Sequence, residues 1–224
     1  MNELLERLEA IEERILSACI KAGRDRNEVK LLAVSKTKPA EMVDSFVSLG
    51  LRNFGENKVQ EAQLKVPACS QQIDWHLIGH LQSNKAKVAA KIFNMIHTVD
   101  SLKLMRMLDN HAETTLPILI QVNVAGEAIK FGAPPEEIED LINAANQMEF
   151  CEVHGLMTIP PFSKDPEKTR EHFASLRALR DSLESSTGTV LPELSMGMSH
   201  DLEVAIEEGS TWIRVGTDLF GARG

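Results

Sequence analysis

The sequence predicts a single α/β domain of the closed (β/α)8 TIM barrel class, spanning residues 1–224, with one extra helix before the first strand. Short apolar runs alternate with helically periodic stretches of about ten to fifteen residues along most of the chain. Eight such runs are present, and 224 residues is an ordinary length for one barrel. Eight repeated strand–helix units favour a parallel sheet that closes into a barrel.

The first element is an amphipathic helix. Apolar residues recur at helical spacing from Leu4 to Ile20, Lys21 lies in the last turn, and Gly23 ends the pattern. This stretch has neither the basic start nor the continuous apolar segment of a secretion signal. Further along, no stretch approaches the roughly 18–20 apolar residues that cross a bilayer, and Lys or Glu interrupts nearly every candidate. We therefore expect a soluble, cytoplasmic protein without a membrane span.

The eight strand candidates are short and mostly apolar. They are residues 30–35, 52–54, 74–78, 95–99, 117–123, 153–157, 192–196 and 212–215. Helical patterns fill the seven gaps between them. Pro39 suits the start of one helix, Gly50 suits its end, and Asp100 or Ser101 suits the cap of a later helix. An open doubly wound sheet is the alternative, but about six strands usually suffice there and no G-x-G-x-x-G follows the first strand.

The composition argues against several kinds of partner. The net charge of −9 repels phosphate backbones and anionic lipid, so nucleic acid and membrane surfaces are not expected partners. Cys19, Cys69 and Cys151 lack the spacing of a disulfide framework or a zinc site, and we expect buried thiols. We expect the tryptophans and phenylalanines to lie in the core, and no metal site.

Lys36 is the first candidate site residue. It follows the apolar run 31–35, so its amine is expected at the mouth of a buried strand. Desolvation and the like charge of Lys38 both favour the neutral amine, which is the form that attacks carbonyl carbons. The alternative from this position alone is an ordinary lysine that reaches solvent at a strand end.

Two further clusters follow the seventh and eighth strands. Barrels often bind phosphate with these two loops, where backbone N–H groups and a helix start approach the anion. Ser199 at a predicted helix start and Gly216-Thr217 fit this role. Alone, a serine before a helix is usually a cap and a Gly-Thr pair is usually a turn. On neighbouring strands, they together indicate a phosphate site.

A lysine that forms a Schiff base and a phosphate site in one barrel describe a ligand with both a carbonyl and a phosphate. Pyridoxal 5'-phosphate (PLP) is such a ligand. Arg214 lies near the end of the eighth strand and is suited to point inward at the ring. A fixed positive charge beside the pyridine nitrogen would oppose its protonation, weaken the cofactor as an electron sink and restrict carbanion chemistry.

The chain resembles the single-domain pyridoxal phosphate homeostasis proteins, also called the YggS or PROSC type, which are related to the amino-terminal barrel of alanine racemase. The resemblance runs from about Leu31 to Arg223. The motifs that carry it are Ala33-Val34-Ser35-Lys36-Thr37-Lys38-Pro39, Phe54-Gly55-Glu56-Asn57, Trp75-His76-Leu77-Ile78-Gly79-His80, His97-Thr98-Val99-Asp100-Ser101, Gly155-Leu156-Met157-Thr158, Leu194-Ser195-Met196-Gly197-Met198-Ser199, Arg214-Val215-Gly216-Thr217 and Phe220-Gly221-Ala222-Arg223.

The resemblance implies the cofactor and its ligands. Lys36 would form the aldimine with PLP, Arg214 would face the pyridine nitrogen, and Ser199 would bind the phosphate. The remaining cofactor-binding residues that it implies are Gly216 and Thr217 at the phosphate, and Asn57, His80 and Met157 around the cofactor. It further implies a monomer that buffers, carries or regulates vitamin B6 cofactor and affects amino-acid and keto-acid balance. Its partners would be PLP and PLP-dependent apoenzymes or B6-metabolising enzymes.

The sequence departs from the family pattern at four positions. Ile129 and Phe131 replace serines, which removes two hydroxyl groups. His200 stands where an aspartate is usual, and Lys58 replaces an aromatic residue after Asn57. The last two changes add positive or titratable character near the expected phosphate face.

Alternative functions share the same lysine. Racemisation needs two bases on opposite faces of the substrate, and in the racemase relatives a tyrosine from the partner subunit is one of them. This chain has no tyrosine, so His76 or His80 would have to act instead, although both suit structural hydrogen bonding. An aldolase-type barrel that acts on a phosphorylated sugar, and a protein-binding module that reports B6 supply, are further alternatives. The carrier or regulator is the interpretation that we favour.

Overall fold

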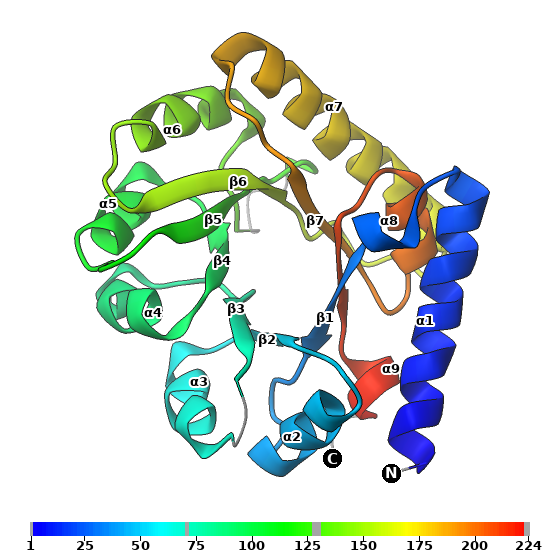
Figure 1. Ribbon diagram of the computed structural model, residues 1–224. Helices are drawn as coiled ribbons and strands as arrows, with labels where there is room; N and C mark the ends of the chain where they lie inside the picture. The colour runs from blue at the N-terminus through cyan, green and yellow to red at the C-terminus, as the bar shows by residue number, and fades with distance from the viewer. Residues whose placement is uncertain (1, 70–71, 127–130, 222–224) are drawn as a thin grey trace.

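The computed structural model describes residues 2–69, 72–126 and 131–221, and its eight strands form a closed parallel barrel in chain order (Figure 1). β1 pairs with β2 on one side and with β8 on the other. This pairing of the first strand with the last closes the sheet. The predicted barrel is confirmed, and the open doubly wound alternative is wrong.

The strands fall where the apolar runs predict them. They are β1 (Lys30–Val34), β2 (Asn53–Glu56), β3 (Asp74–Leu77), β4 (Met95–Val99), β5 (Leu116–Gln121), β6 (Cys151–Met157), β7 (Glu193–Met198) and β8 (Trp212–Val215). Their ends differ from the predicted ends by two residues at most, which is the usual uncertainty of strand boundaries.

The helices surround the barrel, and one of them is additional (Figure 1). They are α1 (Asn2–Ala22), α2 (Ala40–Ser48), α3 (Val59–Lys65), α4 (Ala86–Ile92), α5 (Leu102–Asp109), α6 (Ile138–Ala145), α7 (Arg170–Thr187), α8 (Leu202–Glu207) and α9 (Thr217–Phe220). The extra helix α1 packs against α8 and α9. Ser101 caps α5 by accepting the N–H of Leu104, as predicted. Among the described residues, no helix combines the length and apolar character that a membrane span requires.

The core has an outer layer and an inner layer. The outer layer packs the helices onto the strands, because each helix buries one apolar stripe. The inner layer fills the barrel and consists of Leu32, Val34, Ile78, Met95, Leu119, Met157 and Trp212. The barrel interior is therefore packed with side chains and is not a pore. These side chains form a floor beneath the carboxyl ends of the strands.

The side chains expected in the core mostly lie there. Trp75 and Trp212 are buried, as are two of the three thiols. Cys69 is only partly buried, so that expectation is wrong for it. Phe131 and Phe162 are 57% and 80% exposed and also contradict the prediction. Both lie in loops after strands, where no helix covers them.

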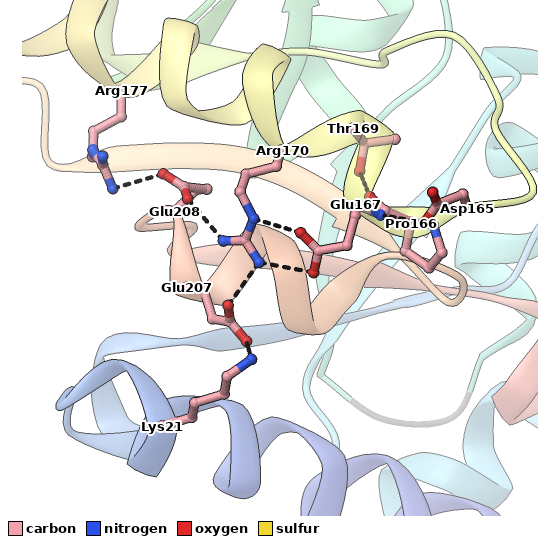
Figure 2. A network of polar contacts seen from close by, with 9 residues as sticks. All are labelled: Lys21, Asp165, Pro166, Glu167, Thr169, Arg170, Arg177, Glu207 and Glu208. Atoms are coloured by element: carbon pink, nitrogen blue, oxygen red, sulfur yellow. Dashed lines mark hydrogen bonds and ion pairs between the residues drawn. The ribbon is translucent and has the colours of Figure 1, made fainter.

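An ion-pair network on the surface ties α7 to α8 and α8 to α1 (Figure 2). Arg170 of α7 binds Glu207, the last residue of α8, at 2.8 Å and Glu208, which follows it, at 2.9 Å. Lys21 of α1 binds the same Glu207, at 2.6 Å. We call the six residues of this set the outer network: Lys21, Glu167, Arg170, Arg177, Glu207 and Glu208.

Candidate functional site

A cavity of about 270 Å³ opens at the carboxyl ends of the strands. Its floor includes Val34 and Arg214, and its walls come from the loops after β1, β2, β3, β6, β7 and β8. Six of the eight predicted cofactor-binding residues line it: Lys36, Asn57, Ser199, Arg214, Gly216 and Thr217. The barrel topology therefore gathers residues up to 181 positions apart in the sequence, from 36 to 217, around one space.

Lys36 lies in the turn that follows β1, as the sequence predicts. Its side chain is half-buried and lines the cavity, together with that of Lys38. The next residue, Thr37, has a φ of 64°, a left-handed backbone conformation that is uncommon outside glycine. Such a conformation persists only where surrounding contacts stabilise it. The hydrogen bonds of this turn provide that stabilisation.

A buried charge network lies beneath this turn. Lys65 of α3 donates to Glu56 of β2 at 2.6 Å, to Glu61 at 2.8 Å and to the backbone oxygen of Ser35 at 2.7 Å. Glu61 accepts the N–H of Thr37, and the Ser35 hydroxyl donates to Glu56. We call Ser35, Glu56, Glu61 and Lys65 the inner network. It holds the residues on both sides of Lys36.

Burial sets the electrostatics of the inner network. Glu56 is fully buried and Lys65 nearly so. Burial raises the pKa of the Glu56 carboxyl, and hydrogen bonds from Lys65 and Ser35 oppose that rise. The second carboxylate oxygen of Glu56 has no hydrogen-bond partner among the described residues. Sequence analysis missed this network, although a glutamate ending an apolar strand was a signal for it.

Arg214 points from β8 into the barrel and is 3% exposed. Its guanidinium donates to the Ser195 hydroxyl at 2.8 Å and to the Thr158 backbone oxygen at 2.9 Å. Within the described ranges, no carboxylate lies within ion-pair distance of it. Burial lowers the pKa of Arg214 to about 10, so the group stays cationic at neutral pH. A buried cation held by neutral acceptors at a cavity wall suits a ligand acceptor atom.

A chain of hydrogen bonds continues inward from Ser195. The Ser195 hydroxyl lies 2.9 Å from Nδ1 of His97, and Nε2 of His97 lies 2.9 Å from Nδ1 of His76. Burial lowers the pKa of His76 to about 3, and it also lowers the pKa of His97 well below the usual histidine value. Both imidazoles are therefore neutral at pH 7. They support Arg214 from below, and the structural interpretation of His76 is confirmed.

The turns after β7 and β8 form another wall. Ser199 lies in the turn before α8, but the helix begins only at Leu202, so the prediction that Ser199 starts the helix is wrong. Asp201 takes the position before the helix and accepts the N–H of Met198 at 2.7 Å. Gly197 brings this turn close to α8, because a Cβ there would lie 2.4 Å from that of Ala205. Gly216 and Thr217 face the same cavity.

His80 and Met157 are outside the set of described residues that line the cavity. Met157 is fully buried in the inner core layer, below the cavity. His80 stacks on Phe131 with ring centroids 3.9 Å apart, and its Nδ1 lies 3.5 Å from Asp100. The cavity does not bring these two residues together with the other six.

The departures from the family pattern fall in different places. His200 lines the cavity, and its ring lies 5.6 Å from that of Phe162, another lining residue. Lys58 is exposed before α3 and does not line the cavity, so its predicted place at the phosphate face is wrong. Phe131 stacks on His80. Ile129 lies outside the described residues. Among the residues that are described, no cluster of three or more histidine, cysteine or acidic side chains suits a metal.

Known proteins are similar to this chain in sequence and in fold. The sequence pattern of the alanine racemase N-terminal domain matches residues 7–224. The pyridoxal phosphate homeostasis protein of Aquifex aeolicus is 45% identical over 97% of both chains. That of Pseudomonas aeruginosa is 44% identical over 100% of this chain and 97% of its own. PipY of Synechococcus elongatus, solved with PLP bound, is 37% identical, with a TM-score of 0.82 over 94% of this chain and 100% of its own.

Proposed function

The chain belongs to the pyridoxal phosphate homeostasis protein family, and we propose that it binds PLP in the cavity above Arg214 and buffers, carries or regulates this cofactor in the cell. The observation that carries the proposal is the lining of one cavity by an amine, a buried guanidinium and two polar turns. A ligand that meets all three needs a carbonyl, a ring acceptor and an anionic group. PLP has all three.

Lys36 is the residue that we assign to covalent attachment. When bound, PLP supplies an aldehyde for imine formation and a ring that can withdraw electrons. The Lys36 nitrogen would bond to the aldehyde carbon, and the aldehyde oxygen would leave as water. The contacts of the inner network to Ser35 and Thr37 support this assignment, because they hold the turn in one conformation. Asn57, which also lines the cavity, is assigned to ring contact.

The phosphate is assigned to the turns of Ser199, Gly216 and Thr217. Their support is geometric, since the hydroxyls of Ser199 and Thr217 and the open backbone at Gly216 all border the cavity. We assign Arg214 to the pyridine nitrogen, because its other donors already bind Ser195 and Thr158. His80 and Met157 are kept only as ring-side candidates, and their position away from the cavity lining weakens that role.

We further propose that the protein does not turn over a substrate. The fixed positive charge of Arg214 opposes protonation of a ring nitrogen and therefore opposes carbanion stabilisation. The chain also lacks tyrosine, and His76 and His97 are buried and neutral below the cavity. We also propose that the protein is monomeric and cytoplasmic. Its proposed protein partners are PLP-dependent apoenzymes or B6-metabolising enzymes.

The test is the absorption spectrum of the purified protein with PLP after free ligand is removed. We expect the native chain to retain the band of covalently bound cofactor and Lys36→Ala to lose it. Borohydride reduction followed by peptide mass spectrometry should place the adduct on Lys36. Lys38→Ala is the matched control, because Lys38 lines the same cavity two residues away. A band that survives Lys36→Ala and disappears in Lys38→Ala would reverse the assignment.

A further inference from the structure

The extra helix α1 reaches the candidate phosphate turns through one side chain. α1 packs along α8 and α9 on the outside of the barrel (Figure 1). From its middle, Arg14 makes four hydrogen bonds to residues near the other end of the chain. It donates to both carboxylate oxygens of Glu203 at 2.7 and 3.0 Å, to Asp218 at 2.8 Å and to the Ser199 backbone oxygen at 2.8 Å.

These partners lie in or directly after the two turns that border the cavity, because Glu203 is in the first turn of α8 and Asp218 is in the first turn of α9. Ser199 is itself a lining residue of the turn after β7, and Asp218 directly follows the lining residue Thr217 after β8. Arg14 does not line the cavity. Its planar guanidinium therefore joins the two turns from outside, with fixed geometry because a guanidinium presents its donors as a rigid fork.

The charges around Arg14 also connect it to the candidate phosphate turns. Glu203 and Asp218 are carboxylates close to the turns where an anionic ligand would sit, and alone they would repel it. Arg14 is ion-paired with both. Hydrogen bonding to Glu203 raises the pKa of Arg14, so its guanidinium stays charged. Removing Arg14 would release the two turns and expose the ligand to both negative charges.

We propose that Arg14 is a positioning residue for the phosphate end of the ligand site, so that α1 makes the protein selective for phosphorylated over unphosphorylated pyridoxal. The inference rests on the proposed PLP-binding function. It assigns a ligand-related role to a helix outside the barrel and to a residue that does not touch the ligand.

Arg24, which lies on the same side of the barrel as α1, offers a matched control. Arg24 follows α1 and donates to the backbone oxygens of Ile206 and Ser210 at 2.9 and 2.8 Å. It thus ties the same helix α8 to the start of the chain but is absent from the cavity lining. Arg24→Ala should lower stability without a specific effect at the phosphate end.

The experiment measures the dissociation constants of PLP and of pyridoxal, which lacks the phosphate, for the native chain and the variants. We expect Arg14→Ala to weaken PLP binding by about tenfold, because the two turns lose the charge-assisted hydrogen bonds that hold them, and to leave pyridoxal binding unchanged. Inorganic phosphate should compete less well with PLP in Arg14→Ala than in the native chain. Arg24→Ala should leave both constants unchanged. Arg14→Lys, which keeps the charge but loses the fork, should lie between native and Arg14→Ala.

The outcomes separate this inference from the function itself. If the native chain binds PLP and Arg14→Ala binds it equally well, the positioning role is wrong while the function stands. Equal losses for PLP and pyridoxal would also overturn the role, because they would indicate general damage to the fold. If the native chain binds neither PLP nor inorganic phosphate, the proposed function fails and the inference with it. If Arg14→Ala does not fold, the ratio of the PLP and pyridoxal dissociation constants of Arg14→Lys tests the positioning role instead.

Discussion

The inner and outer networks use the same kinds of charged group in opposite surroundings. In the inner network, the side chains of Lys65 and Glu56 are 6% and 0% exposed. In the outer network, the side chains of Arg170 and Lys21 are 32% and 69% exposed, and those of their partners Glu207 and Glu208 are 14% and 13% exposed, so water reaches both members of each pair. Water can replace a lost partner in the outer network, and it cannot do so in the inner one. Similar distances therefore correspond to different energies.

The two networks also hold different parts of the molecule. The outer network joins three helices on the outside of the barrel, away from the cavity lining. The inner network grips the turn that carries Lys36. Damage to the inner network should therefore reach the candidate site, whereas damage to the outer network should change only stability. Three predictions test this difference.

The largest effect is expected for Lys65→Met. Removing the cation leaves Glu56 buried without a charged partner, which should lower the free energy of unfolding by about 3–5 kcal/mol. Because Lys65 also binds the Ser35 backbone oxygen, we expect weaker retention of PLP as well. Denaturant unfolding followed by far-UV circular dichroism measures the first effect, and the absorption spectrum with PLP measures the second.

The control for this prediction is the double variant Lys65→Met with Glu56→Leu. Replacing both charges by apolar groups of similar size should restore most of the lost stability, because the desolvation cost disappears with the charges. Native-like stability of the single variant would show that water reaches Glu56, and the contrast between the networks would then be wrong.

The second prediction concerns pH and has opposite signs in the two networks. Burial raises the pKa of Glu56, so the folded state holds this proton more tightly than the unfolded state does. Its contribution to stability should therefore fall as pH rises through the range just above the usual glutamate pKa of about 4.3. Hydrogen bonding from Lys21 lowers the pKa of Glu207. Its contribution should be fully present at neutral pH and be lost as pH falls below that usual value and through the lower pKa of the folded state.

Unfolding free energies measured between about pH 2 and pH 7 test these signs, because the change for Glu56 lies above the usual glutamate pKa and the change for Glu207 lies below it. The unfolding free energy of the native chain minus that of Glu56→Gln should decrease as pH rises. The corresponding difference for Glu207→Gln should increase as pH rises. Equal slopes for the two differences would mean that burial does not control the titration of Glu56.

The smallest effect is expected for Arg170→Ala. Partly exposed ion pairs contribute roughly 0.2–1 kcal/mol each, so we expect a loss of about 1 kcal/mol that shrinks as salt is added. PLP retention should not change. Thermal and denaturant unfolding at low and high salt measure the effect, with Arg177→Ala as a control that removes a single pair to Glu208. A loss as large as that of Lys65→Met would erase the distinction between the networks.

Local patterns were enough to predict the fold. A parallel strand buried on both faces is a short apolar run, and a covering helix has a 3.6-residue period, so both are legible from neighbouring residues. The place of Lys36 followed, since it is the residue just past the first apolar run. The turns after β7 and β8, to which we assign the phosphate, were locatable for the same reason, although the start of α8 at Leu202 was not.

The sequence by itself determined the barrel, the order of its strands and the rim position of Lys36, because these depend on periodicity along the chain. Only the tertiary structure decided which charges meet. Arg14 and Glu203 are 189 residues apart, and Ser35 and Glu56 are 21 apart, so no local pattern pairs them. Side-chain direction and depth are likewise set by packing, which is why Met157 lies in the inner core and His80 stacks on Phe131.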